Sequence, residues 1–149
     1  MKEDHQLHLD NQLCFAVYST SLAITQLYKP LLNSLGLTYT QYLVMLIIWQ
    51  NEGLSLKDVA QKLAQKSGAI TPVVKRLEAL DYIQRVRHPE DDRQLSLTLT
   101  EKGIALKSKA MQITQHVKLQ SGIDEAEMSD LKQRLDAFRN KLPKQINLP

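Results

Sequence analysis

The sequence predicts a mainly α-helical fold that carries one small β-hairpin. Apolar residues recur at helical spacing through most of the 149 residues. Two runs in which apolar and polar residues alternate, 83–87 and 95–99, flank a charged turn and predict the hairpin. Two short helical patterns come before that hairpin, and a further helix starts directly after it. This order of elements is typical of a winged helix-turn-helix.

The first two predicted helices fill the N-terminal third of the chain. The first is expected to begin near Asp10, a suitable N-cap residue, and to be disturbed by Pro30. Thr38 and Gln41 have the spacing of a capping box, which predicts the start of the second helix. The middle of this helix, residues 43–49, is apolar nearly all round, as expected of a helix in the centre of a domain.

The next two predicted helices form the helix-turn-helix. Ser55 with Asp58 predicts the start of a short third helix. The Ser67-Gly68 pair then interrupts the helical pattern, and a fourth helix is expected over residues 69–80. Pro72 is compatible with this helix because it lies in the first turn.

Two further helices are predicted after the hairpin. Thr100 can cap a helix over residues 101–119, and Gly122 interrupts the pattern. Asp124 with Glu127 then predicts the start of the last helix. Its apolar residues repeat at spacings of three and four, like a coiled-coil seam: Met128, Leu131, Leu135, Phe138 and Leu142. Two heptads are too few for a free coiled coil, so we expect this seam to pack on something larger.

The composition sets broad limits on compartment and partners. A chain of this length fits one domain, and its net charge of +3 permits a nucleic-acid partner without demanding one. The longest apolar run, residues 42–49, is far shorter than the about 20 residues that cross a bilayer, and the start of the chain lacks a signal-peptide pattern. We therefore expect a cytoplasmic protein without a membrane partner. The single cysteine, Cys14, excludes an internal disulfide.

The fourth helix carries side chains suited to DNA. A helix in the major groove reads bases mainly through its N-terminal residues. The candidate DNA-binding residues here are Ser67, Gly68, Thr71, Lys75 and Arg76. The segment 55–103 contains nine Lys/Arg and seven Asp/Glu, so it is not a basic block. The hypothesis of DNA binding therefore depends on where these side chains lie.

The hairpin adds basic residues beside this helix. Arg85, Arg87 and Arg93 are candidates for DNA contact, since an arginine at a hairpin tip can enter the minor groove. Asp91, two residues before Arg93, is placed to hold the Arg93 guanidinium in a fixed pose.

The wing and the helix pair resemble those of MarR-family transcriptional regulators. The wing signature is Asp91-Asp92-Arg93, five further residues, then Leu99-Thr100-Glu101-Lys102-Gly103, and residues 56–60 and 67–80 resemble the family's helix-turn-helix. This resemblance covers essentially the whole chain, as one domain over residues 1–149. It implies a homodimer in which N- and C-terminal helices, about 8–36 and 101–149, intertwine. The DNA-binding lobe would be about 37–100. A two-fold dimer implies an inverted-repeat operator with half-sites about one helical turn apart.

Cys14 has two interpretations. A lone cysteine on the apolar side of a helix is most often a small buried hydrophobe. A position in the first turn, however, favours a thiolate. The segment also resembles the OhrR branch of the MarR family, which senses organic hydroperoxides through a cysteine at this place. That resemblance implies that Tyr28 and Tyr39 hydrogen-bond the sulfur; the alternative is that they are ordinary core or interface aromatics.

Geometry restricts how such a site could be built. If Cys14 and Tyr28 share one straight helix, fourteen residues at about 1.5 Å each separate them by roughly 21 Å. The tyrosines that meet Cys14 must then come from the partner subunit. A sulfenic acid formed here has no second cysteine to resolve it, so a small thiol or a backbone nitrogen would capture it, or it would be overoxidised. Candidates for an apolar pocket that favours organic hydroperoxides are Phe15, Leu22 and Trp49.

The leading hypothesis is a repressor that leaves its operator when an organic hydroperoxide oxidises Cys14. In the alternative, a small phenolic or aromatic ligand releases the same repressor and Cys14 is structural. A thiol peroxidase enzyme is disfavoured, since the chain lacks a Cys-x-x-Cys motif and a Thr three residues before Cys14. No cofactor or metal is expected, and the four histidines are interpreted as solvated surface residues: His5, His8, His88 and His116.

Overall fold

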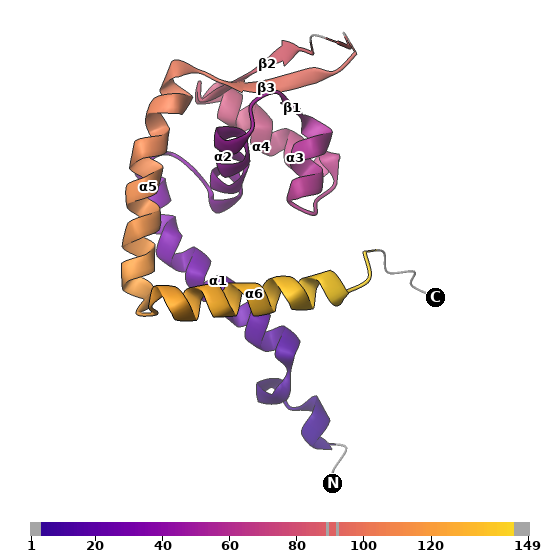
Figure 1. Cartoon of the computed structure of the whole chain (residues 1–149), viewed down its shortest axis with the longest axis vertical. Helices are drawn as coiled ribbons and strands as arrows, with labels where there is room; N and C mark the ends of the chain where they lie inside the picture. The colour runs from indigo at the N-terminus through magenta and orange to yellow at the C-terminus, as the bar shows by residue number, and fades with distance from the viewer. Residues whose placement is uncertain (1–3, 89, 92, 145–149) are drawn as a thin grey trace. The chain divides into compact units, whose positions relative to one another are not determined.

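The computed structural model describes residues 4–88, 90–91 and 93–144. This part of the chain contains two short 3-10 helices, six α-helices and three strands (Figure 1). It divides into two compact units, Met1–Gln115 and His116–Pro149, which are described separately below. None of the helices in the described residues is long and apolar enough to span a membrane.

Helix α1 covers Leu13–Asn33 and starts later than predicted. Asp10 lies instead in the second of the two 3-10 helices, η1 (Asp4–Leu7) and η2 (Leu9–Asn11). The backbone N–H of Gln12 closes η2 by donating to the Leu9 carbonyl at 3.0 Å, and Gln12 then becomes the N-cap of α1. At the other end, α1 continues through Pro30 to Asn33.

Helix α2, Tyr39–Gln50, forms the centre of the first unit. The predicted capping box is confirmed, because Thr38 N–H donates to Gln41 Oε1 at 2.9 Å and Gln41 N–H donates to Thr38 Oγ1 at 3.3 Å. Three of its apolar side chains are completely buried: Val44, Met45 and Ile48. The all-round apolar character of this stretch therefore corresponds to a central position in the core.

The helix-turn-helix consists of α3, Leu56–Lys62, and α4, Ser67–Ala79. The Ser55–Asp58 capping box opens α3 as predicted. Helix α4 begins two residues before the predicted start, so Ser67 and Gly68 belong to its first turn. It buries one face against the core through Ile70, Val74 and Leu77.

The wing is a three-stranded antiparallel sheet with the order β1-β3-β2 (Figure 1). Strands β2, Ile83–Arg87, and β3, Leu95–Leu99, have the predicted bounds, and Arg85 pairs with Leu97. The short strand β1, Leu54–Ser55, pairs with the other edge of β3 and was not predicted. The central strand β3 thus ties the wing to the start of α3.

Helix α5, Glu101–Ser121, begins in the first unit and ends in the second. It is two residues longer than predicted, and Gly122 follows it with a positive φ of 72°. Helix α6, Glu125–Lys141, begins with the predicted capping box of Asp124 and Glu127. Four side chains of its apolar seam are between 39% and 49% exposed: Leu131, Leu135, Phe138 and Leu142. The seam is therefore an apolar face that the chain itself leaves open.

Candidate DNA-binding surface and redox site

The recognition helix α4 presents the predicted DNA-binding residues on its open side. Ser67, Gly68, Lys75 and Arg76 are exposed, and Thr71 is half-buried. Ser67, Thr71 and Lys75 are spaced by four, so they follow one stripe of the helix surface. The Thr71 hydroxyl donates to the Ser67 carbonyl at 2.8 Å, which leaves its oxygen free to accept a further hydrogen bond.

The arginines of the wing have different environments. Arg87 and Arg93 are exposed. Arg85, expected to contact DNA, instead forms a two-point ion pair with Glu78 of α4, with Nε···Oε1 at 2.7 Å and Nη2···Oε2 at 2.9 Å. Arg85 therefore has a different environment from the other two arginines, because a carboxylate of the same chain already holds its guanidinium; its contact with DNA stays a prediction.

The role predicted for Asp91 also needs correction. Its Oδ1 accepts the backbone N–H of Arg93 at 3.0 Å, rather than a guanidinium hydrogen bond. The Asp91 carbonyl accepts the backbone N–H of Gln94 at 3.0 Å, so Asp91 makes two hydrogen bonds to the backbone of the residues that follow it. Asp92, the middle residue of the wing signature, lies outside the described residues.

The second half of the wing signature forms a joint between the segment that connects α4 to β2, residues 80–82, and the start of α5. The Thr100 hydroxyl donates to the Asp81 carbonyl at 2.6 Å and accepts the Gly103 N–H at 3.0 Å, which caps α5. The Lys102 ammonium donates to the Leu80 carbonyl at 2.9 Å and lies 4.9 Å from the ring centre of Tyr82. These contacts give the residues of this motif a structural role in the fold.

Tyr82 belongs to this joint, although no local sequence pattern singles it out. Its hydroxyl donates to the Leu35 carbonyl at 2.9 Å, directly after α1. The Trp49 indole N–H donates to the Gly103 carbonyl at 2.9 Å, so Trp49 is committed to the α2–α5 contact. A role for Trp49 in a hydroperoxide pocket is therefore not supported.

Cys14 is an exposed residue in the first turn of α1. The interpretation as a buried core cysteine is therefore wrong for the isolated chain. Tyr28 lies fourteen positions later on the same continuous helix (Figure 1), which corresponds to roughly 21 Å at about 1.5 Å per residue. Within one chain, the structure does not bring Cys14 to the predicted tyrosines.

The two predicted tyrosines do lie together. The ring centres of Tyr28 and Tyr39 are 5.3 Å apart. A third ring, Tyr42, lies 5.5 Å from Tyr28 and 6.1 Å from Tyr39. The Tyr42 hydroxyl shares a 2.6 Å hydrogen bond with Thr114 of α5. Tyr42 was missed, although its spacing of three from Tyr39 on one helix was a usable signal.

The surroundings keep this tyrosine pair protonated. Burial, followed by the proximity of Tyr42 and Tyr39, raises the pKa of Tyr28 to about 12. Burial and Tyr42 also raise the pKa of Tyr39. A phenol whose pKa is raised above its usual value of about 10 stays neutral at physiological pH, so both hydroxyls are hydrogen-bond donors there.

A small pocket of about 240 Å³ adjoins Tyr39. Its lining comes from α1 and from the residues that lead into α2: Thr25, Gln26, Lys29, Asn33, Leu37, Thr38 and Tyr39. Neither Phe15 nor Leu22 is part of this lining. Among residues 4–88, 90–91 and 93–144, no group of three His, Cys, Asp or Glu side chains is arranged to hold a metal ion.

Known proteins place this fold and sequence in one family. The family model for the transcriptional regulators SarA/Rot matches residues 26–110. The organic hydroperoxide resistance transcriptional regulator of Bacillus subtilis is 42% identical over 137 residues, which covers 92% of this chain and 90% of the relative. This chain belongs to the MarR-type winged-helix transcriptional regulators.

Solved MarR-type structures agree with this assignment. One of these structures is reduced AbfR bound to DNA; AbfR is a protein of Staphylococcus epidermidis. It has a TM-score of 0.76 and 31% sequence identity, over 95% of this chain and 99% of that one. The repressor CouR bound to a 23-mer DNA duplex has a TM-score of 0.81 over 90% of this chain and 96% of that one, but only 22% identity, so it shows the fold alone. The predicted winged helix-turn-helix is confirmed.

Proposed function

We propose that this MarR-type regulator is a transcriptional repressor that leaves its operator when an organic hydroperoxide oxidises Cys14. The observation that carries the proposal is the pair of protonated tyrosines, Tyr28 and Tyr39, with ring centres 5.3 Å apart. Two phenol donors of this kind are suited to hold a thiolate. An exposed Cys14 at a helix N-terminus supplies the matching sulfur.

The proposed DNA contacts follow from the two open surfaces of the lobe. Helix α4 enters the major groove with Ser67, Gly68, Thr71 and Lys75, while Arg76 contacts the backbone. The exposed Arg93 at the wing tip enters the minor groove, with Arg87 beside it. Two such lobes in a homodimer would bind an inverted repeat.

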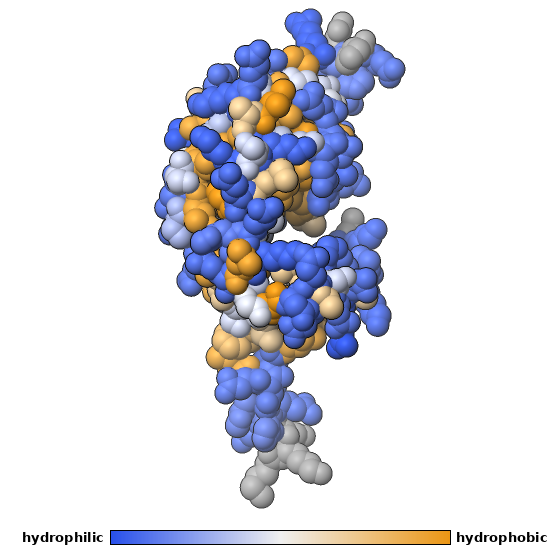
Figure 2. All heavy atoms as spheres, turned by 60° about the vertical axis from the view of Figure 1, so that its left-hand side comes forward, coloured by the Kyte–Doolittle hydropathy of each residue, from blue (hydrophilic) through white to orange (hydrophobic). Residues whose placement is uncertain are grey.

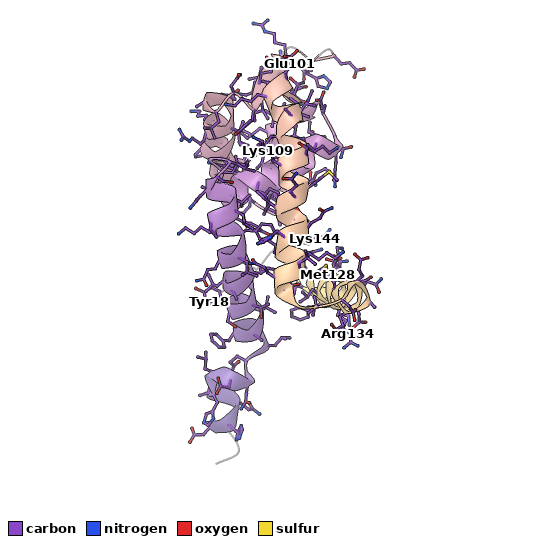
Figure 3. All side chains as sticks on the ribbon, turned by 90° about the vertical axis from the view of Figure 1, so that its left-hand side faces the viewer. Tyr18, Glu101, Lys109, Met128, Arg134 and Lys144 are labelled. Atoms are coloured by element: carbon purple, nitrogen blue, oxygen red, sulfur yellow. The ribbon has the colours of Figure 1, made fainter. Side chains whose placement is uncertain are left out.

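A homodimer through the N- and C-terminal helices is supported by the apolar side chains that the chain leaves open. Figure 2 shows apolar residues at the molecular surface, and Tyr18 on α1, labelled in Figure 3, is 63% exposed. Further exposed apolar residues of α1 are Leu13, Val17, Leu22 and Ile24, and those of α5 are Ile104, Met111 and Leu119. The open seam of α6 adds to these faces. Burial of such a surface favours association.

The dimer also completes the redox site. Because Cys14 and Tyr28 are separated by roughly 21 Å on one helix, each sulfur would meet the tyrosines of the other copy. Each dimer would then contain two sensing sites, and neither would exist in a monomer.

The proposed chemistry is a two-electron oxidation. The Cys14 thiolate attacks the outer oxygen of the hydroperoxide, so that an S–O bond forms while the O–O bond breaks. The sulfur becomes a sulfenic acid, and the peroxide leaves as an alcohol whose hydroxyl proton derives from the thiol. Tyr28 and Tyr39 would donate hydrogen bonds to the thiolate without losing their protons.

The sulfenic acid then has three outcomes. A small cellular thiol forms a mixed disulfide with loss of water, a backbone nitrogen forms a sulfenamide, or further peroxide overoxidises the sulfur. Each outcome adds bulk, charge or a new bond at a packed interface. The tyrosines would move, and the dimer would shift toward a spacing of its lobes that does not fit the operator.

A small phenolic ligand as the signal is not favoured. The structural relative that supports it, CouR from Rhodococcus jostii RHA1 bound to p-coumaroyl-CoA, is only 19% identical, so it shares the fold alone. By contrast, a relative that is 42% identical, from Bacillus subtilis, is an organic hydroperoxide resistance transcriptional regulator.

The direct test compares Cys14→Ser with the wild-type protein on an operator duplex selected from a random-sequence pool. Both proteins are expected to bind, and only the wild type should release the duplex on treatment with cumene hydroperoxide. Mass spectrometry should find oxygen or a thiol adduct on Cys14. Ser21→Ala, an equally small change at an exposed position of α1, should respond like the wild type. Release by Cys14→Ser, or by phenols instead of peroxide, would contradict the proposal.

A further inference from the structure

An ion pair joins the recognition helix to the wing. Arg85 of β2 donates through Nε and Nη2 to the two carboxylate oxygens of Glu78, at 2.7 and 2.9 Å. The two side chains are only 30% and 25% exposed. Two parallel hydrogen bonds between planar groups define their relative orientation as well as their distance. The pair therefore fixes β2 against the last turn of α4.

The other ion pairs in the described part of the chain have a different character. They connect residues within α6 or across the α5–α6 turn, and each has at least one well-exposed side chain: Lys118–Glu125, Lys132–Asp136, Arg134–Asp130 and Arg139–Asp136. Exposed pairs of this kind contribute little to stability. Among the described residues, Glu78–Arg85 is the pair that connects two DNA-binding elements.

The strand register explains why Arg85 faces α4. Arg85 lies opposite Leu97 of β3, whose side chain is completely buried in the core. Side chains that lie directly opposite each other on paired strands point to the same face of the sheet. Arg85 therefore shares the core-side face with Leu97. Arg87 has the same parity but lies farther along the strand and is exposed. The wing thus carries a guanidinium turned inward, toward the recognition helix.

Resting on the proposed operator binding, we propose that Glu78 and Arg85 are positioning residues for sequence-specific DNA recognition. The pair holds α4 and the wing at the angle at which both reach their grooves on the same duplex. Contacts made in both grooves together distinguish the operator, whereas contacts to phosphates alone are the same on any sequence. The pair therefore supports operator specificity more than general affinity for DNA.

The test is a double-mutant cycle on the reduced protein. The variants are Glu78→Gln, Arg85→Gln and the double variant. The probes are the duplex that the wild type selects from a random pool and a random-sequence duplex of equal length. Each single variant should bind the operator about tenfold more weakly, which corresponds to about 1.4 kcal/mol. The double variant should lose no more operator affinity than the single variant that binds the operator more weakly, because both changes remove the same interaction.

Three controls separate positioning from folding and from charge. Binding to the random duplex should stay within about twofold of the wild type. Arg85→Lys keeps the positive charge but not the two-point geometry, so it should also lose operator affinity. Asp130→Asn, which removes an exposed ion pair of α6, should bind both duplexes like the wild type.

A direct phosphate contact by Arg85 would overturn the proposal. In that case Arg85→Gln would weaken binding to both duplexes and reduce the slope of log affinity against log salt concentration by about one. Glu78→Gln would not weaken operator binding. Additive losses in the cycle would overturn it as well. If the wild type itself selects no operator, the proposed function fails; if it does and the variants match it, only the positioning role fails.

Discussion

Gly103 shows how one residue of the wing motif is required by packing. A Cβ atom at this position would lie 2.0 Å from the Tyr82 carbonyl oxygen and 3.3 Å from Cδ2 of Leu99. The same carbonyl accepts the Thr100 N–H at 3.1 Å, so it cannot move without loss of that bond. Only glycine allows the start of α5 to approach the Tyr82 backbone, directly before β2, this closely.

Gly103→Ala is therefore expected to destabilise the protein. The added methyl group must displace backbone, so the free energy of unfolding should fall by about 2–3 kcal/mol, measured by urea denaturation at a fixed protein concentration. Gly68→Ala is the matched control, since a Cβ there meets nothing within 4 Å and alanine favours helix. Equal stability of Gly103→Ala and the wild type would show that the joint is loose.

The tyrosine cluster shows the limit of prediction from single residues. Tyr28 and Tyr39 were identified only through the OhrR resemblance, because nothing in their local sequence separates them from ordinary aromatics. Burial and Tyr42 raise both pKa values, and Tyr39 also raises the pKa of Tyr28, so the shifts depend on how α1 packs on α2. Tertiary packing of this kind is not encoded in a local pattern.

At the level of elements, the sequence predicted best where a local motif fixes the backbone. Three capping boxes and both hairpin strands were confirmed with the predicted residues. The predicted start of α1 was wrong because Asp10 lies in the 3-10 helix η2, before α1 begins. Strand β1 was missed because two residues give no alternation, and its pairing depends on β3, about forty residues away. The Arg85–Glu78 pair was missed for the same reason, since it needs the register of the sheet.

Arg93 tests the wing as a DNA-binding element. We expect Arg93→Ala to weaken operator binding by about 1–3 kcal/mol, because it removes an exposed arginine of the wing. A salt titration of operator affinity measures this, with circular dichroism to show that the fold is retained. Arg134→Ala, at an exposed position on α6, is the control and should bind like the wild type. Unchanged affinity of Arg93→Ala would exclude Arg93 from the wing contact.

For the molecule as a whole, one chain cannot join the two halves of the proposed redox site. Cys14 is exposed at the start of α1, and Tyr28 and Tyr39 are packed together where α1 meets α2. The apolar faces left open on α1, α5 and α6 are the surfaces through which a second copy would bring these halves together. In the proposed mechanism, sensing requires the dimer, and the dimer sets the spacing of the two DNA-binding lobes.

A mixed dimer tests this central claim most directly. One subunit carries Cys14→Ser, the other carries Tyr28→Phe with Tyr39→Phe, and two different affinity tags isolate the mixed species. The measurement is the rate at which cumene hydroperoxide oxidises the remaining Cys14, followed by mass spectrometry. If the site is shared, this cysteine faces intact tyrosines of the other subunit and should react at the wild-type rate. A rate as slow as that of the homodimer with both tyrosine substitutions would contradict a site built from two subunits.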